Sequence, residues 1–367
     1  MDLNSDIFFA LEDGEIILRD YKNHQEFAIG EGLFKRLLQW SAHRVEELEE
    51  VDHQLYQEKL LEDKKDNYLP RSQWQWDIYS YIFHHGTRDY EPDFDHETTK
   101  EEWLEGYFGV CDKLDPKETV IYPEKEGEVF ALPEPDLSLL NQSNFSDVLK
   151  NRKTCRSFFG EPIALKTLST LLFATFGKIH QADNETAKTW SEENSNAKNH
   201  GIRKSSPSGG SLHPTEAYVI CNHVDELQSG LYYYSVKDHT LVKLRTGYFG
   251  DRLSTLLSDQ YWAKELSIGI FLTARFDRSW WKYPISRAYR VVLLDIGHLS
   301  QTFLLTATAL GLQTWLTGAF RDSEVENFLK VQGPKESAMF FVGAGPGSGS
   351  AYPEGWFETY AERHHSK

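Results

Sequence analysis

The stretch that decides the fold is VVLLDIGHLSQTFLLTATALGL, residues 291–312, the most apolar part of the chain. Its length is about that of a membrane span, but Asp295, His298 and Gln301 would then lie in hydrocarbon, at a cost of kilocalories each. We therefore expect a buried core helix and no membrane anchor. A histidine in such a helix is more often a hydrogen-bonded core residue than a ligand, and we expect this of His298.

Strand-like segments lie on both sides of this helix in the sequence. They alternate with helical segments such as 165–176, where leucines repeat at intervals of three and four. This mixture predicts an α+β fold in which a mixed sheet is flanked by helices. The expected strands are EAYVIC (216–221), the two halves of GLYYYSVKDHTLVKL (230–244), SIGIFLTARF (267–276) and MFFVGAG (339–345).

The N-terminal sixty residues have a pattern of their own. Residues 7–21 predict a hairpin around an Asp-Gly turn, QEFAI (25–29) predicts a further strand, and helical spacing follows over 33–40 and 45–55. We expect a small winged-helix-like module here, a connecting region up to about 140, and a second domain over 141–367. The polar insert 181–199 is either a lid or a disordered loop.

Composition excludes several classes of protein. Hydrophobic residues make up 40% of the 367 residues, which indicates a folded chain. Acidic residues outnumber basic ones, 56 to 39, so a net charge of -17 disfavours nucleic acid and anionic membranes as partners. The three cysteines form neither a disulfide framework nor a zinc motif. The first residues lack the pattern of an export signal, so we expect a cytoplasmic protein.

Residues 152–156, RKTCR, place three cations and a hydroxyl within five positions of an acidic protein. Arginine offers a planar fork of donors and threonine a hydroxyl, a combination suited to a phosphate monoester. The alternative is a solvated basic turn.

Residues 205–214, SSPSGGSLHP, combine paired glycines with several hydroxyls. Glycines allow close backbone approach to a ligand and hydroxyls can bind its edge, although an ordinary turn is an equal alternative. The segment matches neither a dinucleotide fingerprint nor a P-loop. Small residues at 317–319, TGA, could likewise let backbone amides face a planar ligand.

Lys282 and Tyr283 are adjacent and lie among bulky aromatic residues just before the apolar helix. A neighbouring ammonium favours the phenolate form of a tyrosine, which would make Tyr283 suited to proton transfer. The alternative is an aromatic strand end with a snorkelling lysine.

Taken in order, R-K-T-x-R-S-F, PSGGSLHPTEAYV, GLYYY, the Lys-Tyr pair, YR-x6-GH-x2-Q and ALGL-x5-GAF resemble the SagB/ThcOx-type branch of the flavin-dependent nitroreductase family. The resemblance covers roughly residues 151–345. It implies a homodimer with FMN bound between two chains and the apolar helix at its centre. The N-terminal winged-helix-like module is common in that branch.

The resemblance also implies particular residues for FMN. Lys153 and Thr154 stand where Arg and Ser are more usual, and Ser211 stands where many members have Asn. The FMN phosphate would be bound by Arg152, Lys153, Thr154 and Arg156. The flavin would be lined by Pro207, Ser208, Gly209 and Ser211, and approached by the backbone of Thr317, Gly318 and Ala319.

Lys282 and Tyr283 match the Lys-Tyr pair of azole-forming dehydrogenases. The resemblance therefore implies that a thiazoline or oxazoline, made beforehand in a precursor peptide by a cyclodehydratase, is oxidised without a metal. Tyr283 would be the base, Lys282 would tune it, and dioxygen would reoxidise the flavin. Partners would be the modified peptide and a synthetase complex.

Two other functions remain open. The same flavin could run in reverse with NAD(P)H and reduce dehydroamino acids or nitro and quinone compounds. Alternatively, residues 1–140 could bind a leader peptide while a degenerate flavin domain serves as a non-catalytic scaffold.

Overall fold

The computed structural model describes residues 1–63, 73–89, 99–113, 122–180, 203–331 and 333–365. The chain forms two compact units, Met1–Glu97 and Thr98–Lys367. The predicted lid or loop at 181–199 lies outside the described residues. The predicted start of the second domain near 141 stays a prediction, and β6 (Glu128–Ala131), which precedes it, pairs with a strand of the second unit.

The first unit contains an antiparallel sheet in the order β2-β3-β4. Asp13 and Gly14 connect β2 to β3, and both have positive φ, 49° and 84°, as a two-residue hairpin turn requires. Leu18, Leu37 and Leu55 lie in its hydrophobic core. The predicted hairpin and both helices are confirmed: the elements are β1 (Asp2–Leu3), β2 (Ile7–Glu12), β3 (Glu15–Asp20), β4 (Gln25–Ile29), α1 (Glu31–Ser41), α2 (Glu50–Gln57), β5 (Leu61–Glu62) and α3 (Ile78–His85).

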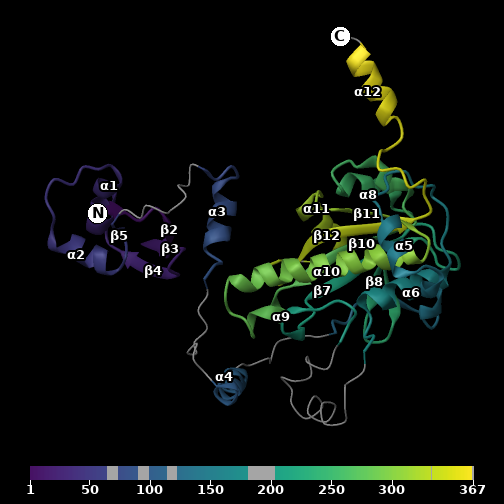
Figure 1. Cartoon of the computed structure of the whole chain (residues 1–367), viewed down its shortest axis with the longest axis horizontal. Helices are drawn as coiled ribbons and strands as arrows, with labels where there is room; N and C mark the ends of the chain where they lie inside the picture. The colour runs from purple at the N-terminus through teal and green to yellow at the C-terminus, as the bar shows by residue number, and fades with distance from the viewer. Residues whose placement is uncertain (64–72, 90–98, 114–121, 181–202, 332, 366–367) are drawn as a thin grey trace. The chain divides into compact units, whose positions relative to one another are not determined.

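The second unit is built on a seven-stranded sheet, ordered β11-β12-β10-β7-β8-β9-β6 (Figure 1). Among the described residues, all of its neighbouring strands pair antiparallel, and parallel pairing is limited to isolated bridges such as Thr154 with Thr314. The predicted α+β class is confirmed, and the sheet that we expected to be mixed is antiparallel. The remaining strands are β7 (Thr215–Cys221), β8 (Gly230–Ser235), β9 (Thr240–Thr246), β10 (Ile268–Arg275), β11 (Gln313–Thr317) and β12 (Glu336–Gly345).

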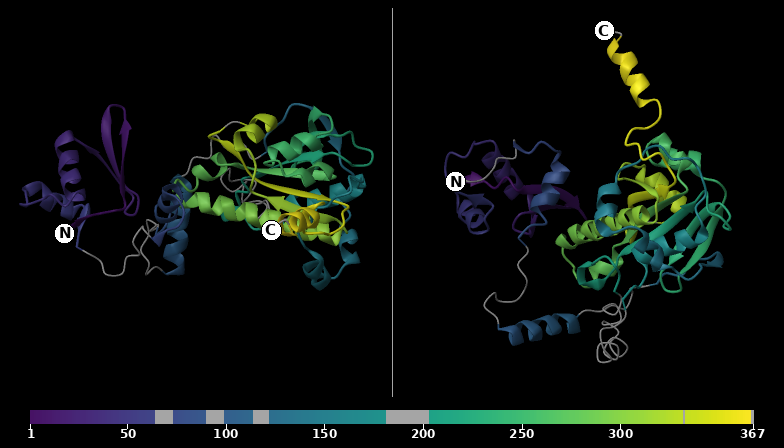
Figure 2. Two further views of the ribbon diagram at one scale, coloured as in Figure 1. Left: turned by 90° about the horizontal axis from the view of Figure 1, so that it is seen from above. Right: turned by 45° about the vertical axis from the view of Figure 1, so that its right-hand side comes forward.

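Helices cover both faces of this sheet, as the two views of Figure 2 also show. Alternation along β7 sends Val219 into the core under α6 and α10, and Tyr218 into the core under α8 and α11. Both cores are therefore sandwiches of one sheet face and two helices. The described helices of the second unit, including those that do not cover the sheet, are α4 (Lys100–Lys113), α5 (Phe145–Asn151), α6 (Leu165–Phe176), α8 (Gly250–Leu256), α9 (Asp277–Trp280), α10 (Arg287–Ala309), α11 (Asp322–Leu329) and α12 (Trp356–His365).

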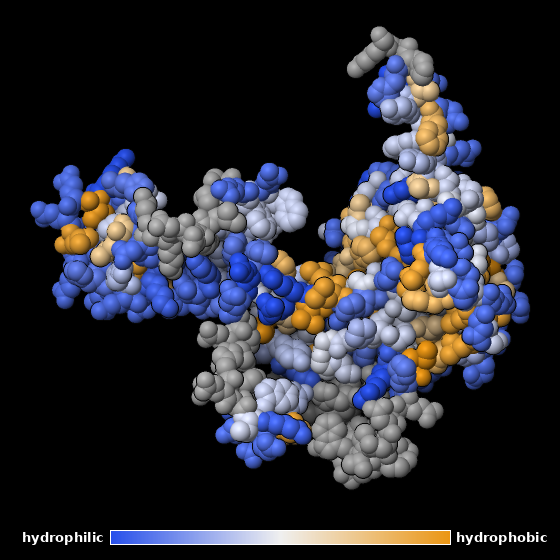
Figure 3. Space-filling model, viewed as in Figure 1, coloured by the Kyte–Doolittle hydropathy of each residue, from blue (hydrophilic) through white to orange (hydrophobic). Residues whose placement is uncertain are grey.

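Helix α10 is the apolar helix that the sequence predicts. Its length and composition would suffice for a membrane span, but half of its apolar window is buried in the fold, so the predicted core helix is confirmed. Leu293 and Leu294 are 42% and 61% exposed on its outer face, and Figure 3 shows hydrophobic side chains over this helix. The expectation that His298 lies in the core is wrong, because helical spacing places it one turn after Leu294 on that exposed face.

Candidate functional site

Residues 207–213, the glycine loop, lie just before β7 and are held by a buried carboxylate. Asp295, on α10, is 4% exposed and accepts a hydrogen bond of 2.5 Å from Ser208 Oγ and one of 3.2 Å from the Gly209 amide. Ser208 Oγ in turn accepts from the His213 amide at 2.9 Å. Burial raises the pKa of Asp295, and the bonds from Ser208 and Gly209 oppose that rise. The start of the loop is thus fastened to the core helix, and the end of the loop is bonded to its start.

The two glycines of this loop are required by close contacts. A Cβ on Gly209 would lie 2.2 Å from Cγ1 of Val291, a residue of α10. Gly210 has φ of 60°, and a Cβ there would lie 2.6 Å from the hydroxyl oxygen of Tyr283. The backbone can therefore approach both α10 and Tyr283 only because side chains are missing.

The structure brings Lys282 and Tyr283 against this loop. Lys282 is 6% exposed, and its Nζ donates a hydrogen bond of 3.3 Å to the carbonyl oxygen of Gly210. The same Nζ lies 5.7 Å from the centre of the Tyr283 ring. The predicted Lys-Tyr pair therefore lies against the predicted loop residues. We call this set the loop group: Pro207, Ser208, Gly209, Ser211, Lys282 and Tyr283.

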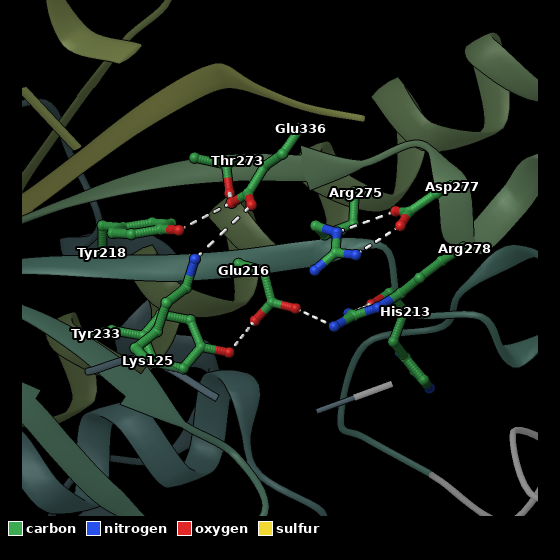
Figure 4. Close-up of polar contacts among 10 residues, drawn as sticks. All are labelled: Lys125, His213, Glu216, Tyr218, Tyr233, Thr273, Arg275, Asp277, Arg278 and Glu336. Carbon is green, nitrogen blue, oxygen red and sulfur yellow. Dashed lines mark hydrogen bonds and ion pairs between the residues drawn. The ribbon is translucent and has the colours of Figure 1, made fainter. Parts of the chain in front are cut away.

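A buried ionic cluster fixes the segment that carries Lys282 and Tyr283 (Figure 4). Arg278, on α9, pairs with Glu216 of β7, and it donates a hydrogen bond of 2.7 Å to the His213 carbonyl of the glycine loop. Glu216 also accepts from the Tyr233 hydroxyl at 2.6 Å. Burial raises the pKa of Tyr233, and the nearby Glu216 carboxylate adds to the rise, so this phenol stays a donor. Arg278 thus joins the sheet, α9 and the glycine loop.

A second ion pair shapes the same corner of the sheet. Arg275 and Asp277 form two hydrogen bonds, of 3.0 and 2.5 Å, across the junction between β10 and α9. Glu336 accepts from Thr273 at 2.6 Å and from the Tyr218 hydroxyl at 3.1 Å. These contacts fix where the chain turns from the sheet into α9, and hence where the Lys-Tyr pair lies (Figure 4).

The predicted phosphate residues lie at the other end of α10. The Cys155 amide donates to the Thr314 carbonyl at 2.9 Å, so residues 152–156 run beside β11. A polar cavity of about 360 Å³ adjoins them and is lined by Lys150, Lys153 and Thr308, among others. Within the part of the chain that the structure describes, none of the cations Arg152, Lys153 and Arg156 is paired with a carboxylate. Of these three cations Lys153 lines the cavity, whereas the Arg156 guanidinium donates a hydrogen bond of 2.7 Å to the Ala351 carbonyl. A cation without a carboxylate partner beside a polar cavity suits an anion.

The predicted backbone segment 317–319 ends β11, the strand beside Thr154. The Thr317 hydroxyl accepts from the Ala319 amide at 3.0 Å, and Gln260 Nε2 donates to the Ala319 carbonyl at 3.0 Å. Gly318 is exposed. These contacts order a tight turn. We call the residues of this turn and the predicted phosphate residues together the β11 group: Arg152, Lys153, Thr154, Arg156, Thr317, Gly318 and Ala319.

The two groups are separated along α10 within one chain. The loop group is attached at Asp295, and the cavity of the β11 group includes Thr308, thirteen residues later. At 1.5 Å per residue this is a separation of about 20 Å along the helix axis. The sequence-predicted site is therefore divided between two places.

Sequence reasoning missed three residues that position the loop group. In the sequence, Asp295 served only as an argument against a membrane-spanning helix. An acidic residue within an apolar helix also indicates a buried polar contact, and this signal could have identified it. Glu216 and Arg278 stood within segments that were recognised, but nothing in their spacing, 62 residues apart, indicates that they pair. Among the described residues, no cluster of three or more His, Cys, Asp or Glu side chains could hold a metal ion.

Comparison with known proteins gives consistent matches to the second unit. The model of the Nitroreductase family matches residues 149–345, more than half of the chain. The nitroreductase-like protein MJ1384 of Methanocaldococcus jannaschii is 28% identical over 206 residues, 56% of this chain and 92% of that protein. The trifolitoxin-processing protein TfxB of Rhizobium leguminosarum bv. trifolii is 32% identical over 142 residues, but the match spans only 38% of each chain.

A solved structure shares the fold. The crystal structure of a nitroreductase-like protein from Anabaena variabilis superposes with a TM-score of 0.50 and 22% sequence identity. The match covers 70% of this chain and 49% of that one.

Proposed function

Because this chain belongs to the nitroreductase family, we propose that it is an FMN-dependent dehydrogenase that oxidises thiazoline or oxazoline rings in a ribosomally made peptide. The matched residues 149–345 include both the loop group and the β11 group. Similarity to TfxB, a protein named for the processing of trifolitoxin, supports a peptide substrate. The observation that carries the proposal is the placement of Lys282 and Tyr283 against Gly210 of the glycine loop.

The residues present fit FMN. The unpaired cations Arg152, Lys153 and Arg156, with the Thr154 hydroxyl, suit its phosphate. A Cβ at Gly209 or Gly210 would collide with Val291 or Tyr283, so the two glycines let the loop backbone lie close to Tyr283, where the flavin ring would be bound. When bound, FMN would supply a two-electron acceptor for a hydride.

The chain's own contribution is proton transfer and positioning. Tyr283, as the phenolate that the neighbouring Lys282 ammonium favours, would take the proton from the ring carbon as the ring becomes aromatic, while the hydride would go to the flavin. The Lys282 ammonium, held by the Gly210 carbonyl, would stabilise the negative charge that develops beside it. Burial of Lys282 keeps water from screening that charge.

We further propose that FMN is bound between two copies of the chain. The two groups lie about 20 Å apart along α10 in one copy, and α10 exposes Leu293 and Leu294 on its outer face. Two copies that pack these faces together around a twofold axis would bring the loop group of one copy toward the β11 group of the other. A cyclodehydratase in a synthetase complex would supply the azoline peptide, and residues 1–140 would bind its leader.

The test is the variant Tyr283→Phe, assayed with a thiazoline peptide by mass spectrometry, in which oxidation removes the mass of two hydrogen atoms. We expect turnover to fall by about a hundredfold or more while FMN absorbance is retained. Tyr248→Phe is the matched control, since the Tyr248 hydroxyl bonds only to the Lys264 carbonyl elsewhere in the fold. Near-normal turnover of Tyr283→Phe would remove Tyr283 as the base.

A second measurement separates the main alternative. Prompt bleaching of the flavin by NADPH, without peptide and without oxygen, would favour a reductase over a peptide dehydrogenase.

A further inference from the structure

Tyr283 also lines a cavity whose other lining residues lie outside the glycine loop. Its volume is about 360 Å³ and it is formed by α9, the turn after it and the first two turns of α10. None of the residues that line it carries a charge. Its main walls are Phe276, Trp280, Tyr283, Ala288, Tyr289 and Val292.

The aromatic walls of this cavity are held in a stack. The Phe276 ring lies between two others: its centre is 6.4 Å from that of Trp280, with planes 13° apart, and 5.4 Å from that of Tyr289, with planes 20° apart. Val292, which is 3% exposed, also lines the cavity. The cavity is therefore a preformed apolar site, because its walls are fixed by packing and not by loops that must move.

Tyr283 is common to the cavity and to the loop group. Its hydroxyl lies against Gly210, and its ring lines the cavity. Any group whose proton reaches the Tyr283 hydroxyl beside the glycine loop therefore lies next to a ring that also lines the cavity. A substrate that is larger than one ring must place its next part there or in solvent.

We infer that this cavity binds the side chain of the residue next to the reacting azoline, and that it selects a bulky apolar or aromatic residue at that position. The inference rests on the proposed function, since it takes the substrate to be a peptide. A volume of about 360 Å³ is at the lower end of ligand pockets, which suits one large side chain and part of the adjoining ring. Uncharged walls make burial of a charged side chain unfavourable.

The experiment measures binding of two model compounds to the FMN-loaded protein by calorimetry. They are N-acetyl-phenylalanyl-thiazoline amide and its glycyl counterpart, which differ only in the side chain that the cavity would hold. Full burial of a phenylalanine side chain predicts that the phenylalanyl compound binds about 10- to 100-fold more tightly. Equal affinities would overturn the inference, and they are also the result expected if a second copy of the chain fills the cavity.

A variant pair locates the preference. Ala288→Trp places a large side chain in the cavity and should reduce the affinity for the phenylalanyl compound to that for the glycyl one. Ala288→Ser changes the volume little and should keep the preference. Retained FMN absorbance reports that both variants fold. A preference that survives Ala288→Trp would overturn the inference.

The proposed function and the cavity can fail separately. Preferential binding without oxidation of the phenylalanyl compound would support the cavity and count against the dehydrogenase. Oxidation of both compounds with equal affinity would support the dehydrogenase and overturn the cavity.

Discussion

Replacement of Asp295 by alanine tests whether the glycine loop is held in place by α10. Asp295 accepts hydrogen bonds from Ser208 and from the Gly209 amide, and it is almost fully buried. A hydrogen bond to a charged acceptor contributes about 1.5–3 kcal/mol. Part of this is offset, because burial already disfavours the carboxylate and raises the pKa of Asp295.

We therefore expect Asp295→Ala to weaken attachment of the loop by about 2 kcal/mol, which lowers the population of the attached loop by up to about 30-fold. If FMN binds only when the loop is attached, its apparent Kd rises by the same factor. Asp295→Asn keeps one acceptor oxygen, so its effect should be about fivefold.

Quenching of FMN fluorescence during titration of the apoprotein measures the Kd. Hydrogen exchange of the Gly209 amide, which should be slow in the wild type and fast in Asp295→Ala, reports the loop without reference to flavin. Ser300→Ala is the matched control, since Ser300 is buried on the same helix and donates only to the Gly297 carbonyl within it. A well-folded Asp295→Ala protein with unchanged Kd and unchanged exchange would refute the role of Asp295.

Three further outcomes follow from single contacts. Gly210→Ala should lower turnover by at least about tenfold, because its Cβ at positive φ displaces the Tyr283 hydroxyl. Gly32→Ala on α1, where the Cβ meets nothing within 4 Å, should leave turnover unchanged. Burial lowers the pKa of His239. The contribution of His239 to the free energy of unfolding is therefore fully present above pH about 6.5, the pKa in the unfolded chain, and is lost as the pH falls through the lower pKa of the folded state. In urea denaturation, the difference in stability between wild type and His239→Asn should shrink over this pH range, and a difference independent of pH would contradict this. Leu294→Glu should shift the protein toward monomer in analytical ultracentrifugation, and an unchanged sedimentation coefficient would remove α10 from the dimer interface.

The role of His239 follows from a complete set of hydrogen bonds. Ser169 Oγ donates to the Pro133 carbonyl at 2.5 Å, so it can only accept from Nε2 of His239 at 2.8 Å. Burial lowers the pKa of His239, so the ring is neutral near pH 7 and carries its one hydrogen on Nε2. Nδ1 then accepts from the Tyr234 hydroxyl at 2.8 Å, and the ring joins the β8–β9 hairpin to α6.

The sequence predicted the fold where local pattern and global packing agree. Apolar spacing identified α10 and α6, and the Asp-Gly turn identified the first hairpin, because these signals depend on residues within one turn or one hairpin. The family was also recognised, as the match to residues 149–345 confirms. The outer face of α10 was not predicted: its leucines and His298 look like core residues, because apolar composition does not distinguish a core from an interface.

The site residues were recognised because their motifs occur in a particular order along the sequence. That order does not predict which of these residues contact one another in the folded chain. The ion pair of Glu216 with Arg278 and the contact of Asp295 with Ser208 join residues 62 and 87 positions apart. Helical and strand periodicities relate residues only a few positions apart, so they cannot indicate contacts between residues this far apart in the sequence. Only the folded chain shows that the glycine loop is held from two sides.

This attachment bears on how many copies of the chain make one site. A loop bound to α10 by Asp295 and to α9 by Arg278 cannot leave its position to reach the cations near Thr308 without breaking buried, charge-assisted contacts. One ligand that touches both groups must therefore either span the length of α10 or be shared by two chains. The exposed leucines on the outer face of α10 favour the second arrangement, since the twofold contact that we propose there would bury them and would bring each loop toward the other chain's cations. On this argument, Leu294→Glu should lose FMN together with the dimer, whereas Asp295→Ala should lose FMN and stay dimeric.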